Sequence, residues 1–225
     1  MGRLISRRLR LAASALILAA TLSAAPGVSV DAFAADSNAS ANLVSQVAAH
    51  LAQAKSVRAQ FTQTQTMAAL KQPLVSSGSL LLVRDRGVIW RIETPYKTTY
   101  VITDSGVTQL DAAGHRVGKP NSANGARGVA QVSKMMRAML GGDLSALYSQ
   151  FDVSADGTPA QWNMTLTPNQ PQIAQSIKGL QMSGGEQLQH IRIALANGDV
   201  TQIDFTRSPE PAEAGAAERT LLGAP

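Results

Sequence analysis

The sequence contains no cysteine, and this absence excludes several classes of protein. Disulfide-stabilised scaffolds, thiol enzymes and proteins anchored by a lipid on an N-terminal cysteine all need the missing side chain. The three histidines, His50, His115 and His190, are far apart and form no metal-ligand motif. We therefore expect no metal site and no cofactor, and we interpret these histidines as surface or turn residues.

The sequence also lacks the motifs that mark common catalytic sites. It has no Gly-x-Ser-x-Gly, no His-Glu-x-x-His and no phosphate-binding glycine loop. Aspartates such as Asp104, Asp156 and Asp199 stand at expected turns, where backbone hydrogen bonding accounts for them. Aromatic residues make up only 4% of the chain, which disfavours a sugar-stacking cleft. We expect no catalytic residues and no enzymatic activity, and clustered acids inside a cavity are the enzymatic alternative left open.

The longest apolar run is shorter than the ~20 residues of a membrane-spanning helix. It belongs to an N-terminal segment with the features of a secretory signal. Four arginines between residues 3 and 10 precede Leu11–Leu22, and Ala32-Phe33-Ala34 fits a signal peptidase site. We expect residues 1–34 to be a cleaved signal peptide and the protein to be periplasmic. Cleavage after Ala25 and an uncleaved anchor are the alternatives.

Export changes what the charge implies. The whole chain carries 20 basic and 15 acidic residues, but four of the basic and one of the acidic residues lie in the signal segment, which leaves a charge of +2. This near balance gives no support to nucleic-acid binding. The remaining chain of about 190 residues suits one domain. We place that domain at 35–207, followed by a flexible tail over 208–225 that is rich in proline, alanine and glycine.

Hydrophobic periodicity predicts a mainly β, α+β protein. Asn42–Val57 has apolar residues at helical spacing, and a second helical pattern covers Val129–Leu140. Most other segments alternate and are separated by short turns, which is typical of antiparallel sheets. The expected strands are Ser56–Met67, Gly78–Val83, Val88–Thr94, Lys97–Thr103, Val107–Leu110, His115–Lys119, Phe151–Ser154, Gln161–Thr167, Ser176–Ser183, Gln189–Leu195 and Val200–Thr206.

The hairpin formed by Gly78–Val83 and Val88–Thr94 is the most informative stretch. Its first strand contains Leu80-Leu81-Leu82-Val83, which is apolar on both faces and needs cover on both sides. The connection Arg84-Asp85-Arg86-Gly87 is polar, and Gly87 can adopt the positive φ of a tight turn.

Three methionines, Met135, Met136 and Met139, lie with Val132 on one side of the second helix. They fit either an ordinary core stripe or a flexible surface for apolar ligands of varied shape. With the many-stranded sheet, the second interpretation predicts a curved sheet whose concave apolar face is covered by amphipathic helices and holds acyl chains.

Several of these segments resemble the outer-membrane lipoprotein carrier family, LolA. The similarity lies in Val57–Gln63, in Ser77-Gly78-Ser79-Leu80, and in the positions of Arg84, Trp90 and Pro95. Met139–Leu144 is similar to a divergent branch of that family. The resemblance implies an incomplete antiparallel β-barrel that carries lipoprotein acyl chains from the inner membrane to an outer-membrane receptor. It also implies that Arg84 hydrogen-bonds a helical lid and keeps the empty carrier closed.

The sequence thus predicts a monomeric periplasmic carrier whose partners are acyl chains, an inner-membrane exporter and an outer-membrane receptor. A lipid-sensing regulatory module and an accessory carrier for a lipid or pigment exporter are the alternatives. Arg84 is the expected lid latch, and a solvated turn residue is its other interpretation. The expected cavity residues are Phe61, Leu80, Leu82, Trp90, Ile92, Val101, Val132, Met135, Met136 and Met139.

Overall fold

The computed structural model describes residues 31–117, 147–208 and 210–223. The expected signal peptide lies almost entirely outside these ranges, and so does the expected helix Val129–Leu140. Among the described residues, no helix is both long enough and apolar enough to cross a membrane.

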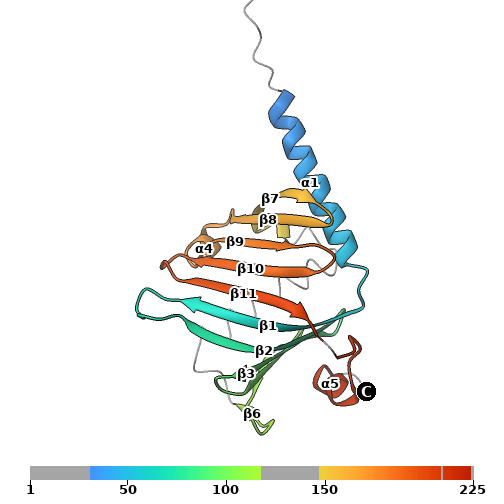
Figure 1. The fold of residues 1–225 in the computed structure, drawn as a ribbon, viewed down its shortest axis with the longest axis vertical. Helices are drawn as coiled ribbons and strands as arrows, with labels where there is room; N and C mark the ends of the chain where they lie inside the picture. Colours follow the sequence, from blue (N-terminus) through green and yellow to red (C-terminus); the bar gives the residue numbers. More distant parts are fainter. Residues whose placement is uncertain (1–30, 118–146, 209, 224–225) are drawn as a thin grey trace, which may run out of the picture.

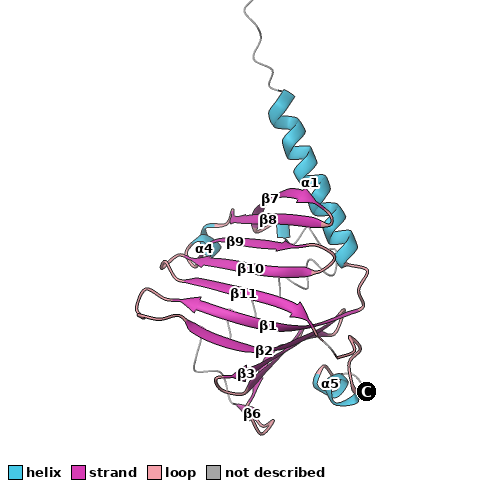
Figure 2. Ribbon diagram, in the orientation of Figure 1, coloured by secondary structure: helices cyan, strands magenta, loops and turns pink. Residues whose placement is uncertain are grey.

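One sheet of 11 strands makes up most of the described chain (Figures 1 and 2). The strands are β1 (Ser56–Thr66), β2 (Leu74–Val83), β3 (Gly87–Thr94), β4 (Thr98–Thr103), β5 (Gly106–Leu110), β6 (Arg116–Val117), β7 (Phe151–Thr158), β8 (Gln161–Pro168), β9 (Ile177–Gly184), β10 (Leu188–Leu195) and β11 (Val200–Arg207). The helices are α1 (Asp31–Leu51), α4 (Pro171–Ala174) and α5 (Ala216–Leu221).

The sheet consists of two antiparallel meanders, β1–β6 and β7–β11, joined by the pairing of β1 with β11. Within this pair, Phe61 lies opposite Phe205. Strands β6 and β7 form the two edges of the sheet, so it is an open sheet and not a closed barrel. The antiparallel organisation and the incomplete barrel predicted from the sequence are therefore confirmed.

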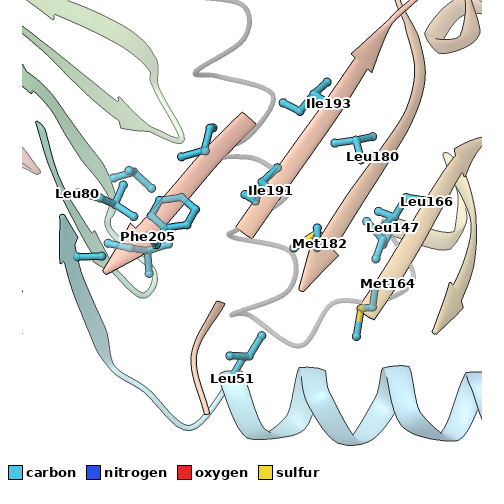
Figure 3. Close-up of a cluster of buried hydrophobic side chains, with 14 of the residues drawn as sticks. Leu51, Leu80, Leu147, Met164, Leu166, Leu180, Met182, Ile191, Ile193 and Phe205 are labelled. Carbon is cyan, nitrogen blue, oxygen red and sulfur yellow. The ribbon is translucent and has the colours of Figure 1, made fainter. Parts of the chain in front are cut away.

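Strand β2 buries apolar side chains on both faces, as predicted, and β3 also contributes to both sides. Leu80, Leu82 and Trp90 belong to the larger apolar cluster, and we call the face that carries it the inner face (Figure 3). Leu81 and Ile89 belong to a smaller cluster on the other side, which we call the outer face. Neighbouring residues point to opposite faces because side chains alternate along a strand.

Several element boundaries differ from the prediction. Helix α1 ends at Leu51 rather than Val57, because β1 already begins at Ser56. Strand β7 continues through Gly157 to Thr158, although Asp156-Gly157 was predicted as a turn. Gly157 has a φ of +100°, and a Cβ there would lie 2.3 Å from the carbonyl oxygen of Gln161. Glycine fits this position in the strand because it tolerates both the positive φ and the close backbone.

Helix α1 covers part of the inner face and lies beside the edge strand β7 (Figure 1). Its apolar side is buried in the larger cluster through Leu43, Val44, Val47 and Leu51. The backbone N–H of Ala155 in β7 donates to Ser40 Oγ at 2.7 Å. The amphipathic helix expected from the sequence therefore docks on the sheet, as its apolar stripe predicted.

The C-terminal segment is not the flexible tail predicted from Ser208. It forms α5 beside β1–β3, and Leu222 belongs to the outer cluster with Leu81, Ile89 and Val101 (Figure 1). The outer faces of β2–β4 are apolar here, so they need cover. The segment has few apolar residues, and for this reason its composition alone suggested a mobile chain.

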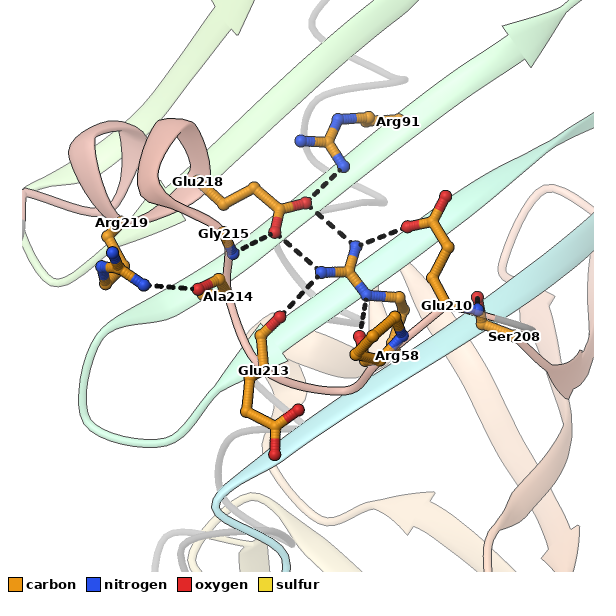
Figure 4. A network of polar contacts seen from close by, with 10 residues as sticks. Arg58, Arg91, Ser208, Glu210, Glu213, Ala214, Gly215, Glu218 and Arg219 are labelled. Atoms are coloured by element: carbon orange, nitrogen blue, oxygen red, sulfur yellow. Dashed lines mark hydrogen bonds and ion pairs between the residues drawn. The ribbon is translucent and has the colours of Figure 1, made fainter.

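A buried ion pair attaches this segment to the sheet (Figure 4). Arg58 on β1 donates to both carboxylate oxygens of Glu218, at 2.9 and 2.7 Å. Its Nε donates to the carbonyl of Pro211 at 2.6 Å, and Nη2 also reaches the carbonyl of Glu213 at 3.1 Å. Arg91 on β3 donates to Glu218 at 2.9 Å.

The same contacts determine how Glu218 titrates. Hydrogen bonds from Arg58, with smaller contributions from the Gly215 N–H and Arg91, lower the pKa of Glu218 from 4.5 to about 2, although burial opposes this shift. A carboxylate with a lowered pKa stabilises the folded state fully above its unfolded pKa, and this stabilisation is lost as the pH falls towards the folded value. The contribution is about 3 kcal/mol, since each pKa unit is about 1.4 kcal/mol.

We predict that Glu218→Gln destabilises the protein at neutral pH by about 3 kcal/mol, because Arg58 keeps its buried charge but loses its buried anionic partner. The remaining carboxylate, Glu210, is 3.2 Å from Arg58 and is exposed, so it compensates little. Urea unfolding followed by circular dichroism measures this change. Wild-type stability should fall as the pH drops from 4.5 towards 2, and the variant should lack that part of the fall.

Glu213→Gln is the matched control, since it makes the same charge change in the same segment. The Glu213 side chain is exposed, and only its backbone carbonyl bonds Arg58, so a loss within about 0.5 kcal/mol is expected. Equal losses in both variants would show that the ion pair does not hold the segment.

Candidate functional site

The centre of the inner face is an aromatic cluster at the junction of the two meanders. The ring centroids of Phe61 and Trp90 are 4.4 Å apart, and those of Trp90 and Phe205 are 6.4 Å apart in an edge-on arrangement. Strands β1, β3 and β11 supply one ring each. All three side chains are buried, which gives the face a large rigid apolar surface at its centre.

Aliphatic and thioether side chains continue this surface over the second meander (Figure 3). Met164 on β8 lies opposite Met182 on β9, and both are almost fully buried. Leu51 at the end of α1 belongs to the same cluster. The remaining labelled members from β8–β10 are Leu166, Leu180, Ile191 and Ile193. Flexible methionines among branched residues suit contact with apolar ligands of varied shape.

Among the described residues, no buried charged side chain lies at the centre of this face. The buried charged residues in the described ranges, Arg58 and Glu218, both belong to the network on the outer face. Burial raises the pKa of Tyr100, so this inner-face phenol stays neutral at physiological pH. The described residues contain no group of three or more histidine, aspartate or glutamate side chains that could hold a metal ion.

Arg84 stands where β2 ends and connects the hairpin to the chain that follows α1. Its Nη2 donates to the carbonyl of Ala54 at 2.9 Å, and its backbone N–H donates to the carbonyl of Lys55 at 2.9 Å. The side chain is half-buried, whereas its neighbour Arg86 is exposed. The described contact of Arg84 is therefore with the α1–β1 connection.

The structure brings together four of the predicted cavity residues, Phe61, Leu80, Leu82 and Trp90, and packs Ile92 against their cluster. Val101 was predicted to join them, but it lies in the outer cluster. Tyr100, Val101 and Ile102 are all apolar, so the sequence alone does not show which of them point to the inner face. In the structure Tyr100 and Ile102 lie on the inner face and Val101 lies on the outer face. Four more predicted cavity residues lie outside the described residues: Val132, Met135, Met136 and Met139.

Val101 instead lines a hollow on the outer face. This hollow has a volume of about 530 Å³ and lies between strands β4–β6, the β2–β3 turn and the α5 segment. Leu110 and Leu222 belong to its apolar lining, and Arg86 and Arg116 also line it. It is separate from the inner-face cluster because the sheet lies between them.

Sequence reasoning missed Phe205, Met164 and Met182 as inner-face residues. Each follows the alternation of its strand, so the face could have been assigned once the register of the neighbouring strands was known. The sequence also gave no sign that His190 pairs with Asp204 across β10 and β11, with 2.7 Å between Nδ1 and Oδ1. That pair is partly solvent-exposed and lies on the outer face.

Several solved structures are similar to this chain, among them the following three. A LolA superfamily protein from Nitrosomonas europaea is 8% identical, with a TM-score of 0.38 over 76% of this chain and 95% of that chain. A DUF1329 family protein from Desulfovibrio piger is 9% identical, with a TM-score of 0.41 over 80% and 96%. MucB in complex with MucA(peri) is 12% identical, with a TM-score of 0.38 over 79% of this chain and 60% of MucB.

No curated protein matches the chain. A family model does, and it covers residues 35–221, from the expected mature start to the end of α5. Its description is "Outer membrane lipoprotein carrier protein LolA-like". The chain therefore belongs to the family of LolA-like outer-membrane lipoprotein carrier proteins.

Proposed function

We propose that this protein is a carrier that binds acyl chains on the inner face of its sheet and moves lipoproteins or related lipids from the inner to the outer membrane. The observation that carries the proposal is the uniform apolar character of that face. It extends from Leu82 on β2 to Leu166 on β8 without a buried charge among the described residues. Membership of the LolA-like family supports the same class of ligand.

Burial of hydrocarbon supplies enough free energy for such a carrier. Each methylene removed from water contributes ~0.8 kcal/mol, so a chain of about fourteen carbons gains ~10 kcal/mol before the cost of binding. No chemical step is needed, since release requires only a receptor with a better apolar site. The proposed carrier therefore has no catalytic residue.

The proposed route begins with export. Residues 1–34 would direct the chain to the periplasm, where an inner-membrane exporter loads it and an outer-membrane receptor unloads it. We propose that the protein works as a monomer. We propose Arg84 as a latch, and the hydrogen bond from its Nη2 to the carbonyl of Ala54 supports this role.

Leu80→Asn tests whether the inner face binds ligand. We predict that the dissociation constant for a fluorescent fatty acid rises about tenfold, which is about 1.4 kcal/mol, because an acyl chain packed there would bury the new amide without a partner. Fluorescence titration of the purified protein measures the change.

Leu81→Asn is the control for this test. Leu80 and Leu81 are adjacent, each is 1% exposed, and they face opposite sides of the sheet. Both variants should lose a similar amount of folding stability, and only Leu80→Asn should lose affinity. An equal loss of affinity in both, or failure of the wild-type protein to take up fatty acid, would contradict the proposed function.

Arg84→Leu tests the latch. The substitution removes the bond from Nη2 to Ala54 and should speed hydrogen exchange of the α1–β1 connection, with a loss of about 1 kcal/mol in local stability. Release of a bound fatty acid should change as well. Arg86→Leu, at the exposed position of the same corner, should change neither measurement. Identical behaviour of the two variants would leave Arg84 as an ordinary turn residue.

A further inference from the structure

Two buried nitrogen atoms of the β2–β3 hairpin have no hydrogen-bond acceptor among the described residues, namely Trp90 Nε1 and Arg84 Nε. The Trp90 side chain lies on the inner face beside Phe61 and Phe205, whose side chains offer no acceptor oxygen. Arg84 follows the inner-face residue Leu82 by two positions. Both atoms carry an N–H group that can donate a hydrogen bond, so each is missing an acceptor oxygen among the described residues.

Trp162 shows that this fold can satisfy a buried indole. Both tryptophans are 1% exposed and belong to the same apolar cluster. Trp162 Nε1 donates to the carbonyl of Gly185 at 2.9 Å, whereas Trp90 Nε1 has no such partner in the part of the chain that the structure describes. A buried indole N–H normally has an acceptor, because an unpaired donor in an apolar environment destabilises the protein. The missing acceptor at Trp90 therefore calls for a physical explanation.

We propose that Trp90 Nε1 donates a hydrogen bond to the ligand and that the acceptor is the carbonyl oxygen of an ester- or amide-linked acyl chain. This inference rests on the proposed function and names the chemical class of its ligand: acyl derivatives in preference to plain hydrocarbons. A neutral carbonyl can be buried among Phe61, Leu80 and Phe205 with one or two donors. A phosphate cannot, because its charge would need more compensation than this apolar site provides.

The Trp90 donor also orients the ligand. With its carbonyl held at the hairpin by Trp90, the methylene chain lies on the apolar side chains of the remaining strands. A hydrocarbon without oxygen would fill the same surface and leave the indole N–H unpaired. The site thus discriminates by hydrogen bonding as well as by apolar area.

Indole N–H resonances in nitrogen-15 NMR spectra of the full chain test the proposal, because the protein has only two tryptophans. The probes are methyl palmitate and an alkane of equal length, both delivered from cyclodextrin. Methyl palmitate should move the Trp90 indole proton downfield and slow its exchange, and the alkane should do neither. Both probes should leave the hydrogen-bonded Trp162 N–H in place.

Trp90→Phe provides a second measurement, since it keeps an aromatic ring and removes the donor. The preference for methyl palmitate over the alkane should fall about fivefold, equivalent to about 1 kcal/mol for one hydrogen bond. Trp162→Phe is the matched control: it removes the other buried indole, and the ratio of the two affinities should stay unchanged.

Three results would overturn the inference. The first is equal movement of the Trp90 resonance with both probes, and the second is binding of methyl palmitate that leaves this resonance unmoved. The third is a Trp90 N–H that already shows a hydrogen-bonded shift and slow exchange in the empty protein. If neither probe binds, the proposed function itself fails and the inference fails with it, whereas binding of both without discrimination removes the inference alone.

Discussion

The architecture depends on one constraint: strands β2 and β3 are apolar on both faces, so each face must be covered. The chain provides the two covers from its opposite ends. Helix α1 precedes the sheet and packs on the inner face, and the segment around α5 follows the sheet and packs on the outer face. Because the outer cover has few apolar residues, the Arg58–Glu218 ion pair supplies much of what holds it.

The sequence predicted the features that depend on local pattern. Alternation along Leu80-Leu81-Leu82 and the positive φ of Gly87 follow from a few adjacent residues, and both are confirmed. Val101 was assigned to the wrong face because its neighbours Tyr100 and Ile102 are also apolar, so apolar and polar residues do not alternate there. The role of the C-terminal segment was missed for a different reason. The composition of a segment indicates how much apolar surface it can bury. It does not indicate that an arginine distant in the sequence, Arg58, pairs with Glu218.

The candidate site was predictable to a similar extent. Phe61, Leu80, Leu82 and Trp90 were found because each lies in a strand with a readable pattern. Phe205 was not, since its contact with Trp90 depends on the register between β1 and β11, which no short stretch of sequence specifies. The Trp90 indole, which has no acceptor within residues 31–117, 147–208 and 210–223, also has no sequence signal. It becomes visible only by comparison with Trp162, a residue of the same type whose hydrogen bond is satisfied.

The pairing of β1 with β11 also determines when the protein can fold. Ala59 must find Arg207, so the inner face is incomplete until almost the whole chain is available. Such non-local pairings are slow to form because the closure of a long loop precedes their gain in free energy. Until β11 is available, Trp90 and Leu80 on the first meander lack part of the cover that the folded sheet gives them. Late closure therefore makes those apolar strands the point at which aggregation must be prevented.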